Sequence, residues 1–136
     1  MQTAEPLAGA RNLPVTITAD LTEVDWGEWT GVNLKTLEAL PEWTQFNAQR
    51  AFLAPPGGET PTELRARVFR FLNKAINGTN DRVLVAFTHS DVIKTALLGC
   101  LGVSLQMMHQ LDIQPVSIST IESFGQVPRI VGMNCV

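Results

Sequence analysis

The sequence predicts an α/β domain of three layers, in which a mainly parallel sheet lies between helices. Residues 83–87 form a continuous apolar run with two valines, too short for a helix and without polar alternation, as expected of a strand buried on both faces. Residues 92–101 follow with apolar side chains at helical spacing, and a second helical pattern at residues 61–77 precedes the run. The run therefore suits the centre of a parallel sheet with helices packed against it.

Length and composition indicate one domain, residues 1–136, with a core that needs no disulfide or structural metal. The net charge of −3 and the absence of a lysine and arginine cluster argue against a nucleic-acid partner. No apolar run is long enough for a bilayer, so neither a membrane nor export is expected. Cys100 and Cys135 show no metal-site or disulfide spacing, which favours a cytoplasmic location.

The first 31 residues predict a helix, a strand and a long loop. Residues 2–10 have helix-forming composition but no cap, and we expect them to be the tail of a helix that begins earlier. Residues 15–19, VTITA, are β-branched and predict a short strand. Residues 21–31, LTEVDWGEWTG, combine acidic side chains, tryptophans and glycines without helical or strand periodicity. Long loops of this composition usually carry function.

Short helices and a turn are expected between this loop and the central run. Leucines three residues apart predict a helix at residues 34–40, which Pro41 ends or kinks, and residues 43–52 predict a second one. Residues 54–60, APPGGET, form a Pro/Gly turn before the helix at residues 61–77.

The helix at residues 61–77 carries recognisable end signals. Thr60 or Thr62 is its expected N-cap, with Pro61 at the first helical position. Residues 77–78, Asn-Gly, are its expected C-cap.

The last third of the chain predicts a short helix and two strands. Residues 104–110 are expected to be helical, whereas residues 116–123 alternate as a half-buried strand. A turn at residues 124–126 then leads to a last strand at residues 129–133.

His89 stands between the central run and the helix that follows, where Ser90 or Asp91 is expected to be the N-cap. In open α/β sheets this is where ligands bind, and the free N–H groups of a helix N-terminus favour an anion such as phosphate. A histidine there can donate hydrogen bonds to a phosphoryl oxygen. By itself, however, a histidine that ends a strand is more often a structural residue.

The loop at residues 21–31 holds two candidates for a general acid, Glu23 and Asp25, although both also suit solvated loop carboxylates. His109, on the predicted short helix, has no strand or glycine turn before it and is expected to be a structural or surface residue. The tryptophans are expected to pin the loop to the body of the domain, although one of them could instead line a substrate pocket: Trp26, Trp29 and Trp43.

Five motifs in succession resemble those of the histidine phosphatase superfamily, the phosphoglycerate mutase-like proteins: QTAEPLA, LTEVDWGEWTG, PGGET, VAFTHSDVIKTALLGCLG and PVSISTIE. The resemblance runs from Gln2 to Asn134. It implies that Glu23 is the proton-donating acid and that His89 is the second active-site histidine, which binds phosphate together with Ser90. It also implies a phosphomonoester hydrolase that acts on a small-molecule phosphate ester through a phosphohistidine intermediate, without cofactor or metal.

One part of the family pattern is absent from the 136 residues. Family members begin with a strand that leads to an arginine-histidine-glycine motif, whose histidine becomes phosphorylated, and they carry a second phosphate-binding arginine before the segment that matches QTAEPLA. Neither occurs in the chain. We therefore expect an N-terminally truncated α/β/α sandwich that lacks its first strand. That strand would lie beside residues 83–87, and its loss would leave an open sheet edge through which a homo-oligomer can form.

Several functions stay open at this point. The first is a phosphatase, and the second is phosphotransfer of the phosphoglycerate mutase type. The DWGEWTG loop and the short chain resemble the phosphatases more than the mutases. A third reading is a catalytically inactive phosphate-binding fragment or pseudoenzyme, and a fourth is a module that assembles through its sheet edge. Turnover of a phosphate ester separates the first two from the others.

Overall fold

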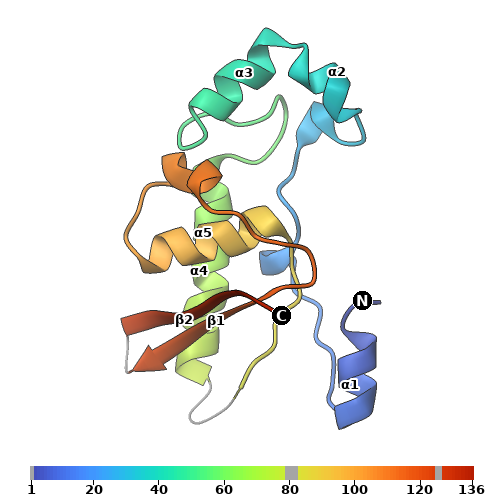
Figure 1. The fold of residues 1–136 in the computed structure, drawn as a ribbon, viewed down its shortest axis with the longest axis vertical. Helices are drawn as coiled ribbons and strands as arrows, with labels where there is room; N and C mark the ends of the chain where they lie inside the picture. Colours follow the sequence, from blue (N-terminus) through green and yellow to red (C-terminus); the bar gives the residue numbers. More distant parts are fainter. Residues whose placement is uncertain (1, 79–82, 125–126) are drawn as a thin grey trace.

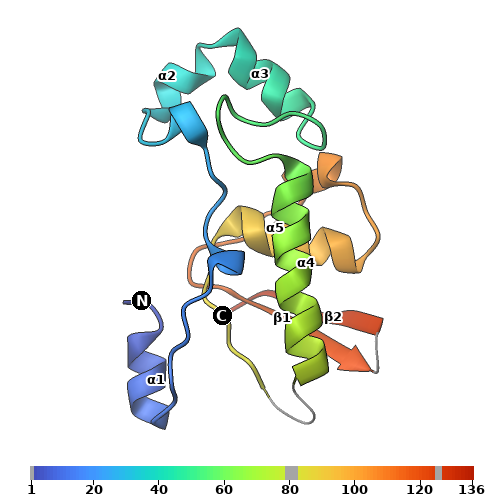
Figure 2. The same cartoon turned by 180° about the vertical axis from the view of Figure 1, so that it is seen from behind.

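The structure is a computed structural model that describes residues 2–78, 83–124 and 127–136. Figure 1 shows α2 and α3 at one end of the molecule, β1 and β2 at the other, and α5 crossing α4 between them. Figure 2 gives the same arrangement from behind, with α1 to one side of the body. The elements are α1 (Glu5–Arg11), η1 (Ala19–Leu21), η2 (Gly27–Trp29), α2 (Leu34–Glu38), α3 (Pro41–Ala48), α4 (Pro61–Gly78), α5 (Ser90–Cys100), η3 (Leu105–Gln110), β1 (Ile118–Phe124) and β2 (Val127–Cys135).

The helices agree well with the prediction. Helix α4 covers the predicted residues 61–77. Helix α2 ends at Glu38, before the predicted residue 40, and α3 begins at Pro41 and ends at Ala48 rather than spanning residues 43–52. The predicted helix at residues 104–110 is present as η3. These patterns predict helices because apolar side chains at helical spacing lie on one face of a helix, which can then be buried against the rest of the protein. In the described part of the chain, no helix combines the length and apolarity needed to cross a membrane.

Residues 21–31, which we call the tryptophan loop, are pinned by aromatic packing as predicted. The ring of Trp29 lies edge-on to the rings of Trp43 and Phe46, at centroid distances of 5.4 and 5.2 Å. Trp26 contacts the same two rings. Edge-to-face packing of this kind adds to the free energy gained from burial. The aromatic cluster therefore joins the loop to α3.

A second buried cluster joins the start of the tryptophan loop to the two long helices. Leu64 and Val68 of α4 pack against Val92 of α5, and all three side chains are almost fully buried. Leu21 and Val24 cover the same cluster from the loop. The loop is therefore held at both ends, by apolar contacts with α4 and α5 at its start and by the aromatic rings further along.

The N-terminus of α4 carries a reciprocal capping box. The side chain of Thr60 accepts a hydrogen bond from the N–H of Glu63 at 3.2 Å, and the Glu63 carboxylate accepts from the N–H of Thr60 at 2.9 Å. The carboxylate also accepts a hydrogen bond from the Thr60 hydroxyl at 2.7 Å, and this bond together with the one from the Thr60 N–H lowers the pKa of Glu63. The choice between Thr60 and Thr62 is thus settled in favour of Thr60.

The predicted central strand at residues 83–87 differs from the prediction. This segment has no regular secondary structure, and its apolar side chains are exposed, Val83 at 93%. Within the described ranges, the sheet consists of β1 and β2, which pair with each other in antiparallel register, so no strand is left to pair with the segment. A β-branched run forms a strand only where a neighbour completes its hydrogen-bond ladder. Pairing of this segment with a second chain stays a prediction.

The strand predicted at residues 15–19 is wrong for the same reason. Residues 15–18 have no regular structure, Ala19 begins the turn η1, and Ile17 is 73% exposed. By contrast, the two strands predicted near the end of the chain are confirmed, because β1 and β2 satisfy each other. Their predicted turn includes residues 125–126, which lie outside the described residues. Asn77 and Gly78, the predicted C-cap of α4, are instead the last two residues of the helix.

The predicted N-cap of α5 is also corrected. His89 occupies the N-cap position with extended backbone angles, φ −112° and ψ 161°, and no side chain caps the helix. Ser90 is already the first helical residue. The carboxylate of Asp91 binds Arg50 at 2.8 Å instead. A hydrogen bond between two charged groups is stronger than one between a carboxylate and a neutral N–H group.

The tryptophan loop passes so close to the turn before α4 that a side chain would not fit at Gly27. This residue has φ +51°, and a Cβ atom there would lie 2.2 Å from the carbonyl oxygen of Pro56. Gly31 also has positive φ, +76°, but faces open space. Gly27→Ala is expected to lower the free energy of unfolding by about 2–4 kcal/mol, and Gly31→Ala by only about 1 kcal/mol. Urea unfolding of both variants measures the difference, and equal losses would show that backbone strain rather than the close approach makes Gly27 necessary.

Candidate active site

His89 lies at the N-terminal end of α5 with an exposed side chain. Its carbonyl oxygen accepts the N–H of Ile93 at 3.0 Å, which fixes its backbone to the first turn of the helix. Among the described residues, its imidazole has no hydrogen-bond partner, so both ring nitrogens are available to a ligand. The first N–H groups of a helix also lack partners within it. The helix end and the imidazole together can therefore bind an anion.

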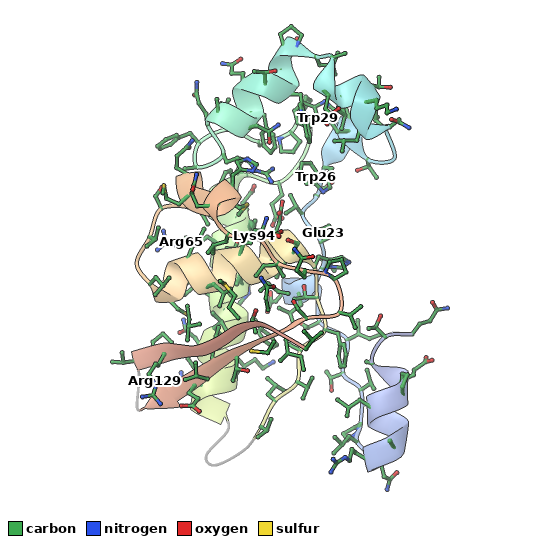
Figure 3. All side chains as sticks on the ribbon, in the orientation of Figure 1. Glu23, Trp26, Trp29, Arg65, Lys94 and Arg129 are labelled. Carbon is green, nitrogen blue, oxygen red and sulfur yellow. The ribbon has the colours of Figure 1, made fainter. Side chains whose placement is uncertain are left out.

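The tryptophan loop is tied to this end of α5 by a direct hydrogen bond. The hydroxyl of Thr88 donates to the carbonyl oxygen of Leu21 at 2.7 Å, which joins the residue before His89 to the loop. Leu21 and Val24 also pack against the buried cluster to which Val92, in the first turn of α5, belongs. Figure 3 accordingly shows Glu23 beside the N-terminal end of α5. The two predicted site residues, 66 positions apart in the chain, thus belong to one region of the fold.

The carboxylate of Glu23 is half-buried and held by its own backbone. Its Oε1 accepts the N–H of Val24 at 2.8 Å. In the part of the chain that the structure describes, Oε2 has no hydrogen-bond partner. A carboxyl group with one fixed and one free oxygen is suited to exchange a proton with a ligand that lies against it.

A surface groove of about 540 Å³ opens beside Glu23 towards α4, but it is not a phosphate site. Its carboxylates outnumber its cations, and both arginines are already paired, Arg67 with Glu59 and Arg70 with Asp20. The field in the groove therefore repels an anion. His89 is not part of the groove, which is lined by Thr22, Glu23, Asp25, Gly57, Gly58, Glu59, Glu63, Ala66, Arg67 and Arg70.

Arg50 is a residue near the site that the sequence patterns did not single out. Its guanidinium lies 5.3 Å from the ring centre of Trp26 and 4.7 Å from that of Phe46, and it pairs with Asp91 in the first turn of α5. It therefore links the aromatic cluster of the tryptophan loop to the helix that His89 begins. No spacing rule predicts this pair, because Arg50 and Asp91 meet only through the fold.

Asp25 and His109 are not brought to the site by the described contacts. Asp25 is exposed, and its Oδ1 accepts the N–H of Gly27 at 2.9 Å, which shapes the turn. His109 lies on η3, where partial burial and the charges of Arg50 and Lys94 lower its pKa. Neither side chain is placed beside His89 by a described contact. Within the described ranges, no three His, Cys, Asp or Glu side chains come together to hold a metal ion.

Comparison with curated proteins gives relatives of low sequence identity whose match covers most of this chain. A bifunctional protein of Mycobacterium tuberculosis and an uncharacterized protein of Mycobacterium bovis are each 29% identical to this chain over 124 residues. The match covers 90% of the chain and 34% of either relative. The chain thus spans about a third of the length of the curated relatives it matches.

Solved structures confirm the α/β fold and its similarity to phosphoglycerate mutase-like phosphatases. Bacillus stearothermophilus YhfR superposes with a TM-score of 0.89 at 21% identity, covering 99% of this chain and 68% of that one. The α-ribazole phosphatase from Shigella flexneri gives a TM-score of 0.82 at 20% identity, covering 97% and 66%. A mycobacterial glucosyl-3-phosphoglycerate phosphatase with bound VO3 gives 0.84 at 21% identity, covering 98% and 71%.

The family assignment rests on the whole chain. The family model for the histidine phosphatase superfamily, branch 1, matches residues 1–136. This match includes the tryptophan loop, the turn before α4 and the segment around His89, which the fold brings together. The chain belongs to the histidine phosphatase superfamily, branch 1.

Proposed function

We propose that the full-length protein is a phosphomonoester hydrolase that acts on small-molecule phosphate esters through a phosphohistidine intermediate. The observation that carries the proposal is the Thr88 to Leu21 hydrogen bond, which joins the helix end at His89 to the loop that bears Glu23. An anion-binding helix end and a carboxyl group are two of the parts that phosphoryl transfer from an ester requires. Phosphatases among the structural neighbours favour hydrolysis over phosphotransfer.

Each of the two residues has a separate part in this proposal. His89 donates a hydrogen bond to an equatorial phosphoryl oxygen, and the N–H groups at the start of α5, that of Ser90 included, add to the same site. As the bond between phosphorus and the ester oxygen breaks, Glu23 protonates that oxygen, so the alcohol leaves neutral. The phosphoryl group passes to the histidine of an arginine-histidine-glycine motif, which the 136 residues do not contain, and then to water.

Binding of orthophosphate or vanadate tests the role of His89. In the full-length protein, His89→Ala is expected to weaken binding by about 10- to 100-fold, because a hydrogen bond to a charged group is lost. Isothermal calorimetry measures the change. His109→Ala is the matched control, since this exposed histidine on η3 is expected to leave the affinity unchanged. Unaltered affinity in a folded His89→Ala protein would remove His89 from the phosphate site.

A further inference from the structure

Arg67 is a buried cation on α4 whose guanidinium donates hydrogen bonds both to Glu59 and to the segment around Glu23. The residue is only 8% exposed. Its Nε and Nη2 donate to the two carboxylate oxygens of Glu59 at 2.6 and 2.8 Å. Its Nη1 donates to the carbonyl oxygens of Asp20 and Thr22 at 3.0 and 2.7 Å, and its Nη2 also donates to that of Glu23 at 3.2 Å. One side chain thus gathers five acceptors from two distant segments.

The bond to Glu23 acts on the peptide unit that holds the Glu23 carboxylate. Arg67 binds the carbonyl oxygen of this unit, while its N–H, which belongs to Val24, donates to Glu23 Oε1 at 2.8 Å. Because a peptide unit is planar, fixing its oxygen also fixes the direction of its N–H. The position of the carboxylate therefore depends on the guanidinium, although the two groups do not touch directly.

Glu59 holds the same segment from the other side. Its N–H donates to the carbonyl oxygen of Asp25 at 2.9 Å, and a Cβ atom at Gly58 would lie 2.4 Å from that oxygen. The turn before α4 thus lies directly against the tryptophan loop. The bidentate pair with Glu59 also neutralises Arg67, so the loop is fixed without leaving an unpaired positive charge beside it.

Only an arginine can make this set of contacts. Its planar fork presents five N–H donors in fixed directions, whereas a lysine ammonium is a single centre that cannot reach acceptors on all sides. Leu64 and Val68 bury the apolar part of this face of α4, and the carbonyl oxygens of the loop satisfy N–H groups of Arg67 that would otherwise be buried without acceptors. The contacts are concentrated on residues 20–23, the stretch that ends at the predicted acid.

We propose that Arg67 is a positioning residue, which holds the Glu23 peptide unit so that the carboxyl group meets the leaving oxygen of the substrate. The catalytic part of this inference, that Glu23 protonates the leaving oxygen, rests on the proposed function. Its geometric content, that the guanidinium fixes the carboxylate of Glu23, can be tested without turnover. Misplacement of a proton donor affects the substrates that need protonation most, so the defect must depend on the leaving group.

The test compares Arg67→Lys with Arg70→Lys in the full-length protein. Arg70 lies one turn further along α4, is 65% exposed and pairs with Asp20, so it is a control for the same chemical change. For Arg67→Lys, kcat on β-glycerophosphate is expected to fall about 10- to 100-fold, while kcat on p-nitrophenyl phosphate falls about threefold or less. Hydrogen exchange of the Val24 amide is expected to quicken at least about tenfold, with exchange in α5 unchanged. Arg70→Lys is expected to change neither.

The two measurements separate the possible failures. Equal loss on both substrates, or an unchanged Val24 exchange rate in folded Arg67→Lys, overturns the positioning role. If the wild-type protein hydrolyses neither substrate, the proposed function fails, whereas the exchange rate of Val24 still decides whether Arg67 fixes the Glu23 peptide. Should Arg67→Lys fail to fold, Glu59→Gln takes its place, because it releases one side of the bidentate pair and is expected to shift both measurements in the same direction.

Discussion

The 136 residues by themselves are expected to have little or no phosphatase activity. Their rate of p-nitrophenyl phosphate hydrolysis should be at least about 10⁴-fold below that of the full-length protein. The chain has two histidines, His89 and His109, and neither occurs in an arginine-histidine-glycine motif. An acid and an anion-binding helix end cannot replace a nucleophile, because the phosphoryl group then has no acceptor on the protein. A colorimetric assay of the 136-residue chain beside the full-length protein measures the difference.

His89→Ala in the same 136 residues shows whether any remaining turnover comes from a contaminant. Activity that is robust in the 136-residue chain and lost in His89→Ala would contradict the expectation and require a nucleophile among these residues. Circular dichroism accompanies the assay, since exposed apolar side chains in residues 83–87 favour self-association or low stability.

Glu23→Gln is the second substitution with a large expected effect. In the full-length protein, kcat for β-glycerophosphate is expected to fall about 10²-fold or more, because glutamine cannot give a proton to the leaving alkoxide. Loss on p-nitrophenyl phosphate should be smaller, since p-nitrophenolate leaves without protonation. Steady-state kinetics on the two substrates gives the comparison.

Asp25→Asn is the matched control for Glu23→Gln. It makes the same change from carboxylate to amide two residues further along the loop, and its Oδ1 can still accept the N–H of Gly27. Near-normal kinetics are expected. If Glu23→Gln reduced both substrates equally, Glu23 would bind or position the substrate rather than donate a proton.

The helices of this protein could be predicted from the sequence because their signals are local. Thr60, Pro61 and Glu63 lie within one turn and start α4 by bonds among neighbours. The apolar spacing that marks α5 likewise lies within the helix itself. The strands depended on partners instead, so β1 and β2, which are close in sequence, were predicted correctly, whereas residues 15–19 and 83–87 were not.

The site residues were only partly within reach of sequence reasoning. His89 and Glu23 stood in recognisable motifs, and the structure brings their segments together through Thr88 and Leu21. Arg50 and Arg67 had no such signal, because a surface arginine and a buried one look alike in sequence. The position of Arg67 between Leu64 and Val68, on the apolar face of α4, was the single hint that it is buried.

The sequence by itself thus determined the helices and the turn before α4, and it predicts His89 and Glu23 as site residues, since each of these depends on residue types at short spacing. The tertiary structure alone decided what fixes those residues in space. Thr88 donates a hydrogen bond to Leu21, which is 67 positions away in the sequence. Arg67 donates to carbonyl oxygens of residues 20–23, which are more than 40 positions away. Such contacts carry no periodicity, because they depend on where the packing of α4 against α5 places the ends of the loop.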